Sequence, residues 1–229
     1  MKNGTSVIVT AIAAIVAGLK DGERVAVLLR HGSRMEHKNL PNDSICAESW
    51  DEISKLGAAI RKAGIKLARI FTSPRGRSVM AACALGEGNA EKEESIAPFR
   101  TDEALTDGSN DIERGGPAIV KKCKAISGER GITGEQALLL SNDDAVSKYA
   151  WQRAAEYGRS ISTHVKMGKG EPLAFVTHGG LMDISILQLL HPKATRLDQL
   201  GTPEKWLEMG AAAIVVFSAE GDVVKVVYL

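Results

Sequence analysis

Short apolar segments alternate with helical patterns along this chain, and this alternation limits its possible folds more than any other feature. Apolar runs at 24–29, 67–72 and 172–177 have the length of buried strands, and each stops at a polar turn. Helical patterns fill the rest, at 48–64, 77–85, 112–124, 143–167 and 181–190. Strands separated by helices need crossover connections. The sequence therefore predicts an α/β domain, a three-layer sandwich with a mainly parallel central sheet.

The remaining segments fit one domain over residues 1–229. Apolar runs at 211–217 and 223–228 flank a turn and predict a closing hairpin. The apolar stretch 7–19 is too short to span a bilayer, and it leads through a turn into a strand. We expect it to form a mostly buried N-terminal helix within residues 1–22. The alternation breaks at about 101–144, which predicts an insertion over the working edge of the sheet.

Composition and charge exclude several classes of protein. Hydrophobic residues make up 44% and charged residues 25%, which excludes wholesale disorder, collagen and coiled coil. Lys and Arg number 29 against 28 Asp and Glu, so no global basic field favours nucleic acid. We expect no membrane span and a cytoplasmic location, or export if residues 1–20 are a signal segment. The oligomeric state stays open, and the apolar first helix could instead be the surface of a homodimer.

Three cysteines, Cys46, Cys83 and Cys123, are odd in number and widely spaced. They match neither a disulfide framework nor a zinc-binding spacing, so we expect buried free thiols. No other cluster of metal ligands stands out, and we predict neither a metal nor a cofactor.

Reactive side chains follow each of the three apolar runs. The turns read Arg30-His31-Gly32-Ser33-Arg34, Ser73-Pro74-Arg75-Gly76-Arg77 and Thr177-His178-Gly179-Gly180. In open α/β sheets, ligands bind at the carboxyl ends of the strands, so these turns should meet at one site. One guanidinium group can bind two oxygens of a phosphate at once. Neutral imidazole can act as a nucleophile that forms a covalent intermediate. The combination predicts a site for a small phosphorylated substrate.

Three motifs in these turns resemble, in order and spacing, those of the histidine phosphatase superfamily. They are Arg30-His31-Gly32, Ser73-Pro74-x-x-Arg77 and Thr177-His178-Gly179, and the resemblance covers roughly residues 23 to 217. It implies a phosphoglycerate mutase-like fold. It also implies that His31 is the nucleophile, that Arg30 and Arg77 hold the phosphoryl oxygens, and that His178 donates a hydrogen bond to them. Arg34 resembles a second phosphate-binding arginine of the acid phosphatase branch.

The proton donor is less well marked. The acid phosphatase branch supplies it from a His-Asp pair, whereas Gly179 follows His178 here. The mutase branch places an acidic residue two positions after a leucine, which Leu105-Thr106-Asp107 matches with Asp where Glu is usual. We therefore expect Asp107 to donate the proton, with Glu103 and Asp102 as rivals.

The resemblance implies a metal-independent phosphatase that hydrolyses a phosphomonoester, or a phosphoamidate, through a phosphohistidine at His31. A phosphomutase is an alternative, although the Glu-Ser/Thr and Trp-Asn pairs that mutases carry after the first motif are missing. A non-catalytic phosphate-binding module is a second alternative, against which the intact His31 and His178 count. Arg75 occupies the variable position of its motif and is expected at the surface or the substrate rim. The histidines outside the motifs are expected to be structural or solvent-exposed: His37, His164 and His191.

Overall fold

The computed structural model describes residues 2–33, 43–92, 95–109, 111–203 and 205–229. Within them the chain forms a six-stranded sheet in the order β3-β2-β4-β1-β5-β6. The strands are β1 (Arg24–Arg30), β2 (Arg69–Thr72), β3 (Phe99–Thr101), β4 (Leu173–Thr177), β5 (Ala212–Phe217) and β6 (Val223–Tyr228). The first four are parallel, whereas β5 runs antiparallel to both β1 and β6. The predicted α/β class, mainly parallel sheet and closing hairpin are confirmed.

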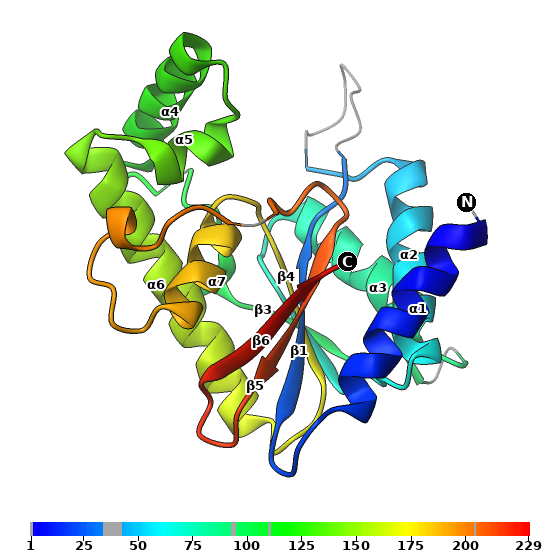
Figure 1. Cartoon of the computed structure of the whole chain (residues 1–229). Coiled ribbons are helices and arrows are strands. Elements are labelled where there is room, and N and C mark those ends of the chain that lie inside the picture. The colour runs from blue at the N-terminus through cyan, green and yellow to red at the C-terminus, as the bar shows by residue number, and fades with distance from the viewer. Residues whose placement is uncertain (1, 34–42, 93–94, 110, 204) are drawn as a thin grey trace.

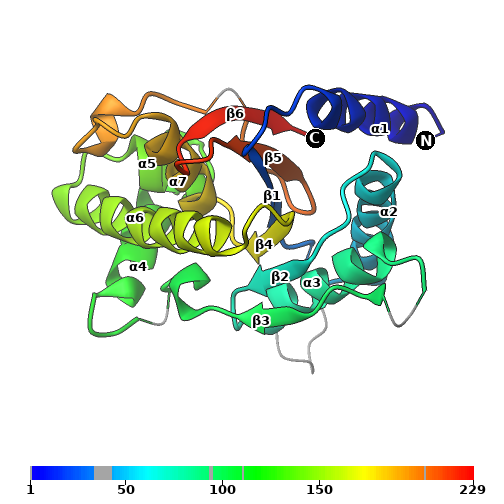
Figure 2. The same cartoon turned by 90° about the horizontal axis from the view of Figure 1, so that it is seen from below.

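Helices cover both faces of the sheet and complete the three layers (Figures 1 and 2). One face carries α1 (Lys2–Ala17), α2 (Ala47–Lys62) and α3 (Gly76–Asn89), and the other carries α6 (Asp144–Met167) and α7 (Leu181–Leu190). Side chains along a strand point alternately to the two faces, so β1 serves two cores. Val25, Val27 and Leu29 pack into one core, and Ala26 and Leu28 into the other. This two-sided burial explains the unbroken apolar run.

The N-terminal helix differs from the prediction. It was expected to be mostly buried, but only one stripe of it is. Ile12 and Ile15 are buried at 0% and 5% exposure, whereas Val7 is 67% exposed. Helix α1 packs on α2 as the outermost element of its layer, so a single face finds a partner (Figure 2). In the described part of the chain, no helix is both long enough and apolar enough to cross a membrane.

The region at 101–144 stands apart from the layers. It holds the short 3₁₀ helix η2 (Glu103–Leu105), then α4 (Gly116–Arg130) and α5 (Gly134–Leu140). A second 3₁₀ helix, η3 (Leu197–Gln199), follows α7. Helices α4 and α5 lie side by side beyond the end of the sheet where β1 and β4 end (Figure 1). The helix predicted at 112–124 begins at Gly116 and ends at Arg130. That this region is an insertion stays a prediction.

Candidate active site

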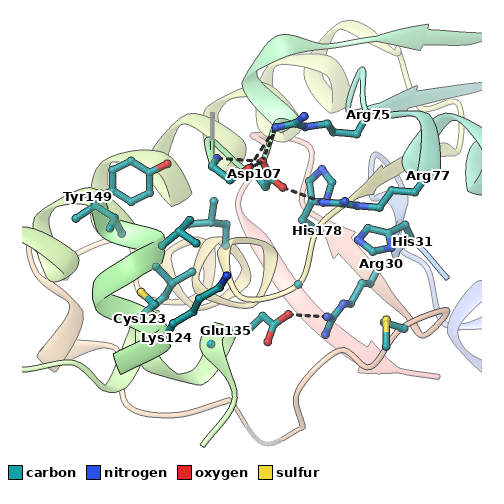
Figure 3. A pocket seen from close by; sticks show the side chains of 18 of the residues that line it. Arg30, His31, Arg75, Arg77, Asp107, Cys123, Lys124, Glu135, Tyr149 and His178 are labelled. Atoms are coloured by element: carbon teal, nitrogen blue, oxygen red, sulfur yellow. Dashed lines mark hydrogen bonds and ion pairs between the residues drawn. The ribbon is translucent and has the colours of Figure 1, made fainter. Parts of the chain in front are cut away.

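The three polar turns meet at one edge of the sheet. Arg30 at the end of β1 pairs with Thr177 at the end of β4, and Thr72 of β2 pairs with Val176. The pairing continues one residue past the end of β1, because the His31 amide donates to the Thr177 carbonyl at 3.0 Å. A cavity of about 750 Å³ opens here (Figure 3). Its polar lining includes Arg30, His31, Arg75, Arg77, Asp107, Glu135 and His178.

His31 is 4% exposed and has a defined tautomer. Its Nδ1 lies 2.8 Å from the carbonyl oxygen of Gly32. A carbonyl oxygen can only accept, so Nδ1 carries a proton, and in the neutral ring the lone pair is on Nε2. A Cβ on Gly32 would lie 2.4 Å from the Cβ of Ser49, so glycine lets α2 pack directly behind the nucleophile candidate.

His178 faces His31, with ring centroids 5.1 Å apart (Figure 3). Its Nδ1 accepts from Arg77 Nη2 at 3.3 Å, and its Nε2 lies 3.0 Å from Ser73 Oγ. Burial lowers the pKa of His178 well below its usual range, because it outweighs the opposing charge of Asp107. The charges of Arg77 and Arg75 add to the effect of burial. The ring is therefore neutral and carries its proton on Nε2, which makes it a hydrogen-bond donor.

Arg30 is held from two sides at the end of β1. Its guanidinium donates to the Leu207 carbonyl at 2.9 Å and to Glu135 at 2.8 Å. A Cβ on Gly179 would lie 2.6 Å from the guanidinium carbon, so the glycine after His178 makes room for Arg30. Burial alone would raise the pKa of Glu135, but the charge of Arg30 and hydrogen bonds outweigh it and lower the pKa.

Sequence reasoning did not find Glu135. It lies in the first turn of α5, whose N-cap Thr133 forms a capping box with Gln136. That Thr-x-x-Gln pattern is a readable helix-start signal, and it could have shown that a helix begins there. It could not have shown that Glu135 contacts a residue 105 positions away.

Asp107 lies between two arginines. It accepts from Arg77 at 2.9 Å and from Arg75 at 3.4 Å, and Ser109 donates to it through both its amide and its hydroxyl. Burial alone would raise its pKa. The interaction with His178, the hydrogen bonds from Ser109 and the charge of Arg75 outweigh burial and lower the pKa of Asp107 to about 2.

The rival acids lie elsewhere. Glu103 is exposed and absent from the cavity lining, and among the hydrogen bonds of the described residues its carboxylate accepts only from the nearby Thr106 hydroxyl. Asp102 caps η2 through the Ala104 amide and accepts a hydrogen bond of 2.5 Å from Ser160. Of the three acidic candidates, Asp107 alone lines the cavity.

Several other predicted residues have clear positions. Arg75 lines the cavity with its side chain 25% exposed, as expected of a rim residue. His164 stacks on Phe71, and His191 is exposed at the end of α7. Arg34 and His37 lie outside the described residues, so the phosphate-binding role of Arg34 stays a prediction. No group of three metal-binding side chains occurs in the described part of the chain.

The fold is similar to that of several solved structures. A phosphoglycerate mutase from Bacillus anthracis matches with a TM-score of 0.61 and 15% identity, covering 90% of this chain and 92% of its own. Bacillus stearothermophilus YhfR matches at 0.54 and 23%, covering 87% and 94%. A mycobacterial glucosyl-3-phosphoglycerate phosphatase, in complex with inorganic phosphate, matches at 0.55 and 16%, covering 90% and 95%.

No protein-family model matches the sequence, and neither does any curated protein. The structural matches show that the chain has a phosphoglycerate mutase-like fold, which is the fold that the resemblance of its three motifs implied.

Proposed function

We propose that this chain is a metal-independent phosphatase that hydrolyses a phosphomonoester, or a phosphoamidate, through a phosphohistidine at His31. One observation carries the proposal. Two buried imidazoles stand 5.1 Å apart at the edge of the sheet, within a cavity that three guanidinium groups also line. This donor set matches a phosphoryl group, whose charge spreads over its oxygens during transfer.

The first step forms a bond between His31 Nε2 and phosphorus while the ester P–O bond breaks. The tautomer imposed by Gly32 supports this role, since it leaves the lone pair on Nε2. Arg30 and Arg77 would hold phosphoryl oxygens as the charge develops. His178 would join them by turning its Nε2 proton from Ser73 Oγ to a phosphoryl oxygen. Arg75 would contribute a further positive charge, and Arg34 is expected to help as a phosphate ligand. The guanidinium charges supply the electrostatic stabilisation for which other phosphatases use metal ions.

Proton transfer is assigned to Asp107. Its low pKa in the free protein arises partly from the neighbouring positive charges. A bound phosphoryl group competes for Arg75 and Arg77, so substrate binding should raise the pKa of Asp107 and let it deliver a proton to the leaving oxygen. In the second step the Asp107 carboxylate takes a proton from water, which attacks phosphorus. The P–N bond then breaks, inorganic phosphate forms and His31 is restored.

The test is hydrolysis of p-nitrophenyl phosphate with EDTA present, comparing wild type, His31→Ala and the control His191→Ala at an exposed histidine. We expect EDTA and the control substitution to leave turnover unchanged and His31→Ala to abolish it. Labelled substrate quenched in base should leave label on wild type and His191→Ala but not on His31→Ala, because phosphohistidine survives base and breaks down in acid. Phosphate binding without turnover would instead indicate a binding module. Transfer of the phosphoryl group to the free hydroxyl of a diol monophosphate, offered in place of p-nitrophenyl phosphate, would indicate a mutase.

A further inference from the structure

The cavity extends well beyond the polar groups that the proposed reaction uses. Its volume of about 750 Å³ lies within the range of small-molecule sites, roughly 300–1,000 Å³. A phosphoryl group held by the arginines and His178 fills only the polar end. The rest of the cavity is therefore available to the alcohol part of a phosphomonoester.

That outer part of the cavity has an apolar wall. Ile119, Val120 and Cys123 come from one side of α4, and Leu138 comes from α5. Tyr149 of α6 completes the wall beside α4 (Figure 3). The wall is well packed, because Ile119, Cys123 and Tyr149 are 7%, 5% and 7% exposed. A wall that is already packed needs little rearrangement to bind an apolar ligand.

Few polar groups in this wall could bind the hydroxyls of a sugar. The Tyr149 hydroxyl is buried and has no hydrogen-bond partner among the described residues, so it could bind one of them. The Cys123 thiol is a weak donor, and burial raises its pKa to about 11, so it stays uncharged. Glu135 faces the cavity, and in the free protein it pairs with Arg30. Lys124 also reaches the cavity (Figure 3), but it is exposed, so a hydroxyl would have to replace water at its ammonium group. A polyhydroxylated ligand would lose water here without gaining equivalent hydrogen bonds.

We propose that α4, α5 and Tyr149 form a leaving-group subsite that selects phosphomonoesters of bulky apolar alcohols over sugar phosphates. The inference rests on the proposed phosphatase function and adds the substrate class. The extent of the cavity supports this subsite, because a single cavity is lined both by the apolar wall and by His31, Arg77 and His178. An apolar group bound against this wall leaves water, and that burial lowers the barrier for the ester attached to it.

The test compares three esters of primary alcohols, so that leaving-group acidity varies little: 2-phenylethyl phosphate, ethyl phosphate and glucose 6-phosphate. We expect kcat/KM for 2-phenylethyl phosphate to exceed that for ethyl phosphate by about tenfold or more, as burial of a phenyl group predicts. Glucose 6-phosphate should be no better than ethyl phosphate. Equal values for the three esters would overturn the subsite.

Val120→Asn tests the wall directly. Val120 is 36% exposed, so the substitution should leave the fold intact, which melting temperature can verify. We expect the ratio of kcat/KM for 2-phenylethyl phosphate to that for ethyl phosphate to fall about tenfold. Val120→Met keeps the wall apolar and should keep the ratio. The matched control is Val224→Asn, an exposed position on β6 outside the cavity lining, and it should also keep the ratio.

These measurements distinguish a wrong subsite from a wrong phosphatase function. If ethyl phosphate is hydrolysed through His31 but the ratio is near one and Val120→Asn leaves it unchanged, the subsite is wrong and the phosphatase function stands. If p-nitrophenyl phosphate and all three esters go unhydrolysed and His31 takes no label, the proposed function is wrong and the subsite is overturned with it.

Discussion

The carboxylate of Asp107 accepts a hydrogen bond of 2.9 Å from the guanidinium of Arg77. In the free protein, the candidate proton donor and a candidate phosphate ligand therefore neutralise each other. Glu135 does the same for Arg30 at 2.8 Å. The two carboxylates hold the arginines in place before substrate arrives. A phosphoryl group that enters the cavity must therefore compete with both carboxylates for the guanidinium groups.

Replacement of the candidate acid should have an effect that depends on the leaving group. In Asp107→Asn, kcat/KM for an alkyl phosphate should fall about 10²-fold or more, because an alkoxide needs a proton to leave. The loss for p-nitrophenyl phosphate should be much smaller, since its leaving group needs no proton. Steady-state kinetics on both substrates check this. Glu103→Gln serves as the control, and an equal loss from that variant would move the role to Glu103.

Asp107 should also contribute to the pH dependence of stability. Its pKa is about 2 in the folded chain and near 3.9 when unfolded, so the unfolded state binds more protons between these values. Its stabilisation is complete above about pH 4 and is lost as pH falls towards 2. The free energy of unfolding, from urea titrations at several pH values, should fall less steeply over this window in Asp107→Asn than in wild type. Parallel curves would contradict the lowered pKa.

The strands that carry the site could be predicted because their signal is local. An apolar run that stops at a polar turn places His31 and His178 at strand ends, and a parallel sheet brings those ends together. Strand β3 was missed because its three residues are exposed and form no apolar run. The burial of α1 was overestimated because its small apolar residues do not mark which face meets a partner.

Contacts between distant segments could not be predicted in the same way. Glu135 reaches Arg30 only because α5 docks beyond the sheet, and no local pattern specifies where a helix docks. Asp107 was selected as the candidate proton donor through the resemblance to a family motif, and its ion pairs with Arg75 and Arg77 were not expected. The apolar wall could not be predicted for the same reason, because it needs two helices to dock together. Val120 belongs to α4, whose bounds differ from the prediction, and Leu138 belongs to α5, which was not predicted.

The pair of Arg30 and Glu135 predicts that a neutral residue at 135 strengthens anion binding. In Glu135→Gln the competing charge is removed while the Leu207 carbonyl still holds Arg30. We expect the Kd for inorganic phosphate, measured by calorimetry at low salt, to fall about fivefold. Glu129→Gln on the exposed side of α4 is the control and should leave Kd unchanged. Weaker binding in Glu135→Gln would mean that Glu135 acts mainly to position Arg30.

The contact between Gly179 and Arg30 predicts a loss of activity without a loss of fold. An alanine Cβ at position 179 would lie 2.6 Å from the guanidinium carbon. The end of a flexible side chain can move away, so the melting temperature of Gly179→Ala should change little. The displaced Arg30 would no longer face the phosphoryl group, and kcat/KM for p-nitrophenyl phosphate should fall about tenfold or more. Gly128→Ala in α4, where a Cβ meets nothing within 4 Å, is the matched control and should keep full activity. If Gly179→Ala is as active as this control, Arg30 does not act on the phosphoryl group.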